Sequence, residues 1–153
     1  MRPSSLAALV ALVAPALAAQ GGDAAAAGLS PKGAIVVGGT VRDSLARGDV
    51  ILPAESTHAQ AWRLAGTAGE TVTLDLVSDA FDAYVFLLGP GLEGELPQDD
   101  DSGGDCNARL TVRLPRTGSY QIVVTSTDKF ATGPFTLTVT AGAKPKSLSP
   151  CRR

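Results

Sequence analysis

The sequence predicts an all-β protein, an antiparallel β-sandwich with jelly-roll-like connections. Three observations support this fold class. About eight short segments alternate apolar and polar residues with the two-residue period of a strand. Turns rich in Gly, Pro and Asp separate these segments. Beyond residue 33, no segment shows the helical period that a crossover helix between parallel strands would need.

The first 18 residues have the features of a signal peptide. An apolar stretch spans residues 6–17, and Ala16-Leu17-Ala18 matches the small-x-small pattern of a signal peptidase site. The stretch is shorter than the roughly 20 residues needed to cross a bilayer. We therefore expect cleavage after Ala18, in preference to an uncleaved anchor. The chain would then be secreted or periplasmic, with no membrane span in its mature part.

Residues 19–33 consist mostly of Gly, Ala, Ser and Pro with little bulk, which predicts a flexible leader. A domain over residues 34–141 follows. Its first strands are expected where apolar positions alternate with polar ones, and Trp62 is expected to anchor the core. These expected strands cover residues 34–37, 39–46, 58–64 and 70–77.

The central strand, residues 81–88, is rich in aromatic and aliphatic side chains and is ended by Gly89-Pro90-Gly91. An acidic turn follows, in which three aspartates from Asp99 to Asp101 precede Ser102 and two glycines. Such a composition predicts a solvated loop. Further strands are expected at residues 109–114, 119–126 and 135–140, and residues 142–153 form a basic tail.

The net charge does not favour nucleic acid as a partner, and the acidic and basic residues lie in different parts of the chain. The exported part would carry 12 Lys and Arg against 15 Asp and Glu, which does not favour nucleic-acid binding. Ten acidic residues and no Lys or Arg lie within residues 65–108, whereas residues 109–153 hold eight basic residues and one acid. We expect these charges to pair between neighbouring strands and loops, with a cation or partner site as the alternative.

Several blocks of sequence resemble the bacterial pre-peptidase C-terminal domain. They are S-D-A-F-D-A-Y from Ser78, the acidic D-D-D-S-G-G turn, N-A-R-L from Asn107, A-G-T-A-G-E-T-V-T-L from Ala65 and T-G-S-Y-Q-I-V-V from Thr117. The resemblance covers about residues 39–141. It implies a β-sandwich that serves secreted hydrolases as an accessory module for secretion, targeting or binding of protein or polysaccharide. Cys106 departs from the family pattern, where Gly, Leu or a similar turn residue is expected.

Cys106 and Cys151 are the two cysteines of the chain, and both lie in the part expected to be exported. Because disulfides persist in oxidising compartments, we expect these two to pair. Such a bridge would tie the basic tail beside the acidic turn. Two unpaired thiols are the alternative.

The acidic turn offers two interpretations. Asp99, Asp101 and Asp105 alternate along a flexible loop, and carboxylate oxygens are ligands that calcium prefers. The turn does not match an EF-hand, because Leu110 stands where the bidentate Glu belongs. The alternative is a structural turn whose carboxylates cap backbone N–H groups or pair with Arg109. In that case a structural cluster of Asp82, Asp100 and Arg109 is expected, since a carboxylate in an apolar strand needs a partner.

The sequence contains no enzyme signature. His58 is the single histidine, and no G-x-S-x-G elbow accompanies it. Zinc would need four close ligands, and only His58 and the two distant cysteines are available. The leading hypothesis is therefore a non-catalytic exported module that binds an extracellular protein or polysaccharide, or that acts beside a secreted hydrolase. The alternative is a structural or secretion-processing domain with no ligand. No cofactor is expected apart from the calcium considered above.

Overall fold

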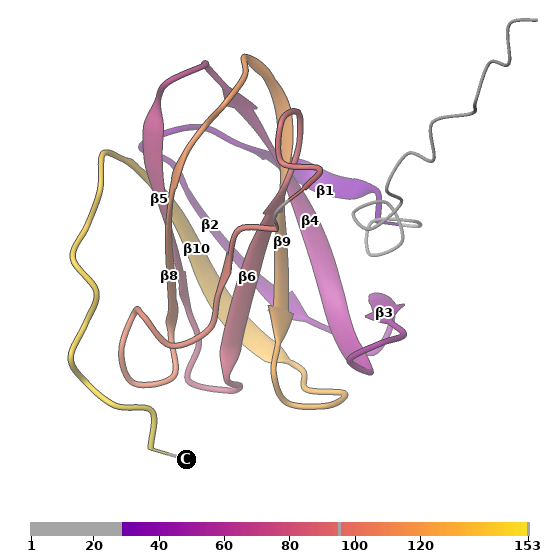
Figure 1. Ribbon diagram of the computed structural model, residues 1–153. Coiled ribbons are helices and arrows are strands. Elements are labelled where there is room, and N and C mark those ends of the chain that lie inside the picture. The colour runs from indigo at the N-terminus through magenta and orange to yellow at the C-terminus, as the bar shows by residue number, and fades with distance from the viewer. Residues whose placement is uncertain (1–28, 95, 153) are drawn as a thin grey trace, which may run out of the picture.

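The computed structural model describes residues 29–94 and 96–152, which form ten strands and no helix (Figure 1). The part of the chain so described therefore contains no helix long and apolar enough to span a membrane. The strands are β1 Pro31–Ile35, β2 Thr40–Leu45, β3 Val50–Leu52, β4 Thr57–Gly66, β5 Thr71–Val77, β6 Ala83–Leu88, β7 Gln98–Asp99, β8 Ala108–Arg113, β9 Gly118–Ser126 and β10 Gly133–Ala141.

Two sheets pack face to face, which confirms the predicted β-sandwich (Figure 1). One sheet has the order β1-β4-β9-β6-β7, with β3 also paired to β4. The other has the order β2-β10-β5-β8. All pairings are antiparallel except that of β1 with β4. Strands adjacent in the sheets are therefore mostly distant in sequence.

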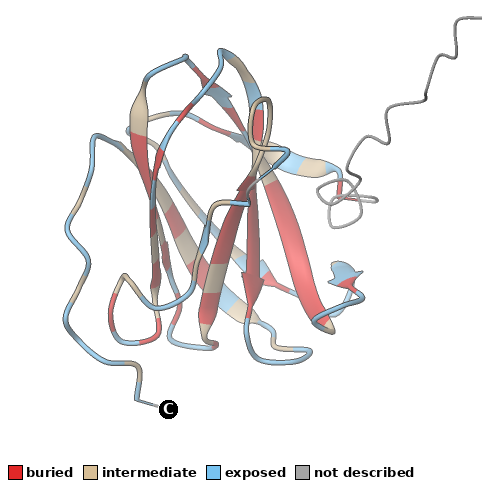
Figure 2. Cartoon of the chain, viewed as in Figure 1, coloured by how far each residue is buried: buried red, intermediate tan, exposed pale blue. Residues whose placement is uncertain are grey.

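The core lies between the two sheets. It forms because apolar side chains at alternate positions of each strand point toward the facing sheet. In β5, Val72, Leu74 and Leu76 are fully buried, as are Ile122 and Val124 in the facing sheet. Figure 2 shows the buried stretches concentrated in the central strands β4, β6 and β9. Burial of this kind stabilises the fold by about 25 cal/mol per Å² of apolar surface.

A smaller apolar cluster covers part of the outer face of the six-stranded sheet. Side chains that point away from the main core pack together there, and the cluster consists of Leu29, Leu52, Ala59, Ala61, Phe86 and Val123, with Tyr84 and Leu88 at its margin. The central strand β6 is thus apolar on both faces, which accounts for its continuous run of bulky residues.

The eight predicted strands are all present, with shifts at their ends. β1 begins at Pro31, within the segment expected to be leader, and β6 begins at Ala83, because the preceding residues form a turn. The sequence did not indicate β3 or β7, which have three and two residues. Trp62 is only partly buried but packs against the core. The expected signal peptide and residues 19–28 of the leader lie outside the described residues.

Candidate binding surface

Asp99 acts as a cap for the acidic turn. It ends β7, and its Oδ2 accepts hydrogen bonds from the backbone N–H groups of Ser102 and Arg109, each at 2.9 Å. A carboxylate that accepts two N–H donors stabilises a turn. Capping of backbone N–H groups is one of the two interpretations that the sequence offered for this turn, and calcium binding is the other.

The other two expected calcium ligands lie further along the same turn. The carbonyl of Asp101 accepts the N–H of Gly104, and Asp105 has a φ of 54° while its N–H points to the carbonyl of Ser149. Within residues 29–94 and 96–152, the carboxylates of Asp99, Asp101 and Asp105 are not brought together as a cluster of metal ligands. The one cluster of three potential ligands found there consists of Asp82, Cys106 and Cys151.

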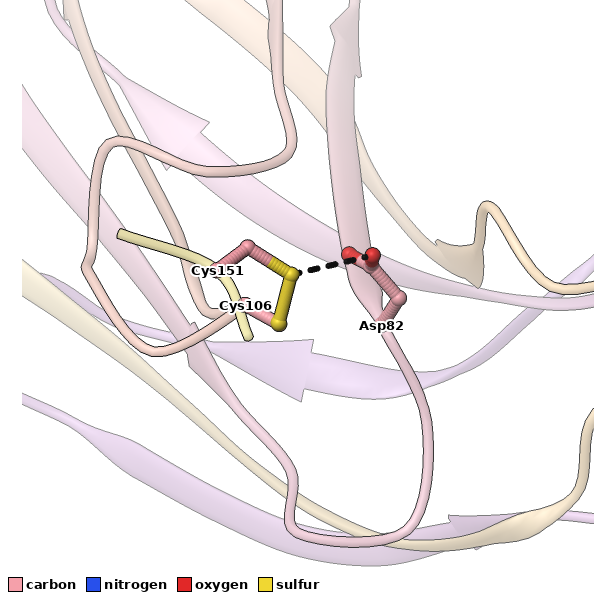
Figure 3. Close-up of side chains that lie close together, drawn as sticks. All are labelled: Asp82, Cys106 and Cys151. Carbon is pink, nitrogen blue, oxygen red and sulfur yellow. Dashed lines mark hydrogen bonds between the residues drawn. A yellow bond between two sulfur atoms is a disulfide. The ribbon is translucent and has the colours of Figure 1, made fainter. Parts of the chain in front are cut away.

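The sulfurs of this cluster are joined to each other. Cys106 and Cys151 form a disulfide across a sequence separation of 45 residues, as the sequence predicted. The Asp82 carboxylate lies beside it, with Oδ2 3.6 Å from the Cys151 sulfur (Figure 3). Thiolates bind metals, whereas disulfide sulfurs do not, so this oxidised cluster serves as a structural cross-link. It fixes the basic tail to the acidic turn.

Arg109 forms its ion pair with Asp75, on the neighbouring strand β5. Nε of Arg109 lies 2.6 Å from Oδ1 of Asp75, and Nη1 donates to the carbonyl of Pro145. Lys144 from the tail lies 2.6 Å from the other oxygen of Asp75, whose side chain is only 12% exposed. The sequence pointed instead to Asp82 or the turn as the partner of Arg109. Asp100 is an exposed residue of the turn.

The tail changes the outer face of β5. Thr73 and Asp75 point away from the core because they alternate with the buried Val72, Leu74 and Leu76, and in a sheet with one solvated face they would be exposed. Thr73 is nevertheless fully buried and donates from its hydroxyl to the carbonyl of Gly142. The tail runs outside the four-stranded sheet beside β8 and β5 (Figure 1). The remaining exposed part of this face therefore lies over β2 and β10.

An open hollow of about 430 Å³ lies on this exposed part, where β2, β10 and the end of β5 meet. Arg42, Thr136 and Val77 lie side by side in the strand register. Val77 is 45% exposed, which gives the hollow an apolar patch among polar groups. The full lining is Arg42, Asp43, Ser44, Val77, Ser78, Asp79, Pro134, Phe135 and Thr136.

Asp43 carries a fixed negative charge at the edge of the hollow. Its carboxylate pairs with Lys32 of β1 at 2.8 Å and accepts the N–H of Ser44 at 2.7 Å. Burial alone would raise the pKa of Asp43, but the Lys32 ammonium and the Ser44 N–H outweigh it and hold that pKa below its usual value. The hollow therefore offers Arg42 as a donor beside carboxylates and hydroxyl groups, which suits a polar ligand.

Comparisons with known proteins identify solved structures with a similar fold. No family model and no curated protein matches the chain. A solved structure of the pre-peptidase C-terminal domain of a collagenase from Bacillus anthracis is 14% identical. It has a TM-score of 0.56, and the match covers 72% of this chain and 97% of that one. A periplasmic inhibitor of g-type lysozyme from Aeromonas hydrophila, PliG, is 19% identical with a TM-score of 0.50, covering 74% of this chain and all of that one. The chain is thus similar in fold to both.

Proposed function

We propose that this chain is an exported, non-catalytic module that binds an extracellular protein or polysaccharide. The observation that carries the proposal is the likeness of its fold to the collagenase domain over 97% of that domain. The lysozyme inhibitor of similar fold acts on another protein, a g-type lysozyme. Both likenesses favour a role in recognition, and the disulfide fits an oxidising compartment.

The hollow over β2 and β10 supplies a surface for this role. It is open, and charged and hydroxyl side chains make up most of its lining, which suits a polar ligand such as a sugar or a peptide backbone. His58 is not among the residues that line this hollow. The residue is 4% exposed, and its ring contacts Phe130. Such burial also argues against a role for His58 as an accessible general base.

Retention of the purified protein on collagen, cellulose, chitin and peptidoglycan tests the proposal. We expect retention on at least one of these materials, and we expect Arg42→Ser to weaken it because Arg42 lines the hollow. Arg113→Ser is the matched control, since Arg113 is an exposed arginine of the same sheet outside the hollow. Absence of retention on all four materials, with and without calcium, would favour a structural or secretion-processing domain without a ligand.

A further inference from the structure

The side chains of Asp82, Cys106 and Cys151 meet where three separate parts of the chain come together (Figure 3). Asp82 directly precedes β6, Cys106 lies at the end of the acidic turn, and Cys151 belongs to the basic tail. One ligand atom from each residue lies within 4.8 Å of the other two. The two cysteines are distant in the sequence, yet their Cα atoms are 4.4 Å apart in the fold. A carboxylate and two sulfurs are thus gathered in one place.

Backbone hydrogen bonds fix two of these residues independently of the disulfide. The N–H of Ala83 donates to the carbonyl of Cys106 at 3.0 Å, which joins the segments that carry Asp82 and Cys106. The carbonyl of Asp82 accepts the hydroxyl of Ser126 at 2.8 Å and the N–H of Thr127 at 3.1 Å. Cys106 is also buried, with 1% of its surface exposed. Reduction of the disulfide would therefore leave these two side chains in place.

The third residue lies on a segment that can adjust its position. None of residues 142–152 is buried, and Leu148 is 98% exposed. The contacts of this segment with the sheet include the hydrogen bond from Arg109 and the ion pair of Lys144 described above, which are polar. Cys151 is only partly buried, so a reductant can reach its sulfur. Because few apolar contacts hold the tail, Cys151 can shift to suit a bound ion.

The distances in the cluster suit a zinc ion. Zinc binds thiolate sulfur at about 2.3 Å and carboxylate oxygen at about 2.1 Å, and its ligands form a tetrahedron. An oxygen and a sulfur on the same ion then lie roughly 3.6 Å apart, and two sulfurs roughly 3.8 Å apart. Oδ2 of Asp82 lies 3.6 Å from the sulfur of Cys151. Once reduced, the sulfurs of Cys106 and Cys151 need only a small separation to reach the second distance.

Negative charge at the cluster favours a divalent cation once the sulfurs are free. Two thiolates and the Asp82 carboxylate would repel one another at this short range. The carboxylate of Asp128 adds to the negative charge, since its Oδ2 accepts the N–H of Asp82 at 3.1 Å. Arg152 and Lys129 are exposed to solvent, which screens their charge, and Arg109 is engaged on the outer face of the sheet. A dication bound by all three ligands offsets the repulsion.

We propose that reduction turns this cluster into a zinc-binding site, so that a disulfide holds the tail in the oxidised protein and a metal ion holds it in the reduced protein. A dithiol reductant supplies two electrons and two protons, which break the S–S bond and leave two thiols, while the dithiol itself becomes a disulfide. Zinc then displaces both thiol protons and binds the two sulfurs and Oδ2 of Asp82. Water takes the fourth position of the tetrahedron. This site is independent of the binding function proposed above.

Binding of cobalt and zinc to the reduced protein tests the site. The protein is reduced with a dithiol, which is then removed by gel filtration under argon, and Co²⁺ is added. We expect one equivalent of Co²⁺ to produce a thiolate charge-transfer band in the near ultraviolet, and Zn²⁺ to abolish the band by displacing cobalt. The oxidised protein should give no band. Zinc should also raise the melting temperature of the reduced protein, because a ligand of the folded state stabilises it.

Two variants with the same change of charge separate this site from general attraction of cations. Asp82→Asn removes the carboxylate ligand and should weaken zinc binding about tenfold or more, because even a residue that only supports a metal ligand contributes that much. Asp101→Asn is the matched control. It alters an exposed carboxylate of the acidic turn outside the cluster and should leave the zinc affinity unchanged.

The test still decides if the reduced protein does not stay folded. In that case zinc should restore the circular dichroism of the oxidised protein in the unchanged chain and in Asp101→Asn, but not in Asp82→Asn at the same concentration. No cobalt band in the reduced protein, or equal zinc affinity of Asp82→Asn and Asp101→Asn, would overturn the proposal.

Discussion

Tyr120 is the largest fully buried side chain, and two glycines make room for its ring. A Cβ on Gly66 would lie 2.4 Å from Cδ1 of Leu114 and 2.9 Å from Cε2 of Tyr120, and a Cβ on Gly89 would lie 2.3 Å from Cδ1 of Tyr120. The phenol donates to the carbonyl of Arg116 and accepts the N–H of the same residue. Tyr120 lies in a strand that the sequence predicted, but its packing against Gly66 and Gly89 could not be predicted, because these residues are distant from it in the sequence.

Replacement of Gly66 by Ala should therefore destabilise the protein by about 1 to 3 kcal/mol, the cost of adding a methyl group to a packed core. Urea unfolding followed by tryptophan fluorescence measures this change. Gly48→Ala is the matched control, because no atom lies within 4 Å of its Cβ position. Its effect should stay within about 0.5 kcal/mol. Equal stability of the two variants would contradict the packing around Tyr120.

Most strands could be predicted because their apolar positions alternate, as Val72, Leu74 and Leu76 do in β5. The short strands β3 and β7 have too few residues to show any period. The polar face of β5 illustrates a different limit. Asp75 is covered by Lys144, 69 residues later in the chain, so no local pattern could indicate its burial. Contacts with the C-terminal tail therefore determine how far the outer face of β5 is buried.

The two ion pairs of Asp75, one with Arg109 and one with Lys144, should contribute unequally to the free energy of unfolding. Arg109→Ala removes a charged hydrogen bond from a carboxylate that is 12% exposed and should cost about 2 kcal/mol. Lys144→Ala should cost less, about 1 kcal/mol or below, because its ammonium is more exposed. Thermal and urea unfolding compare the two variants.

We propose that EDTA leaves the melting temperature of the unchanged protein unaltered, since Asp99 already caps its turn. A fall of several degrees in EDTA would show that calcium stabilises the turn.

At the scale of the whole molecule, the acidic central segment and the basic tail meet on one side of the sandwich. The pairing of Cys106 with Cys151 could be predicted, because a chain expected to be exported has only these two cysteines. The hollow could not be predicted, since Arg42, Val77 and Thr136 come from strands that are neighbours only in the folded sheet.

The disulfide should act as a global constraint on the unfolded chain. A bridge across 45 residues stabilises the fold by about 4 kcal/mol when the loss of chain entropy is counted. The double variant Cys106→Ser, Cys151→Ser should lose about that amount in urea unfolding, and a dithiol reductant should have a similar effect on the unchanged protein. Mass spectrometry of the intact secreted chain should give a mass two hydrogens below the reduced value. Two thiols that alkylate freely without reduction would contradict the bridge. Among the described residues, the tail would still contact β5 and β8 through Lys144 and Arg109, and the acidic turn through backbone hydrogen bonds.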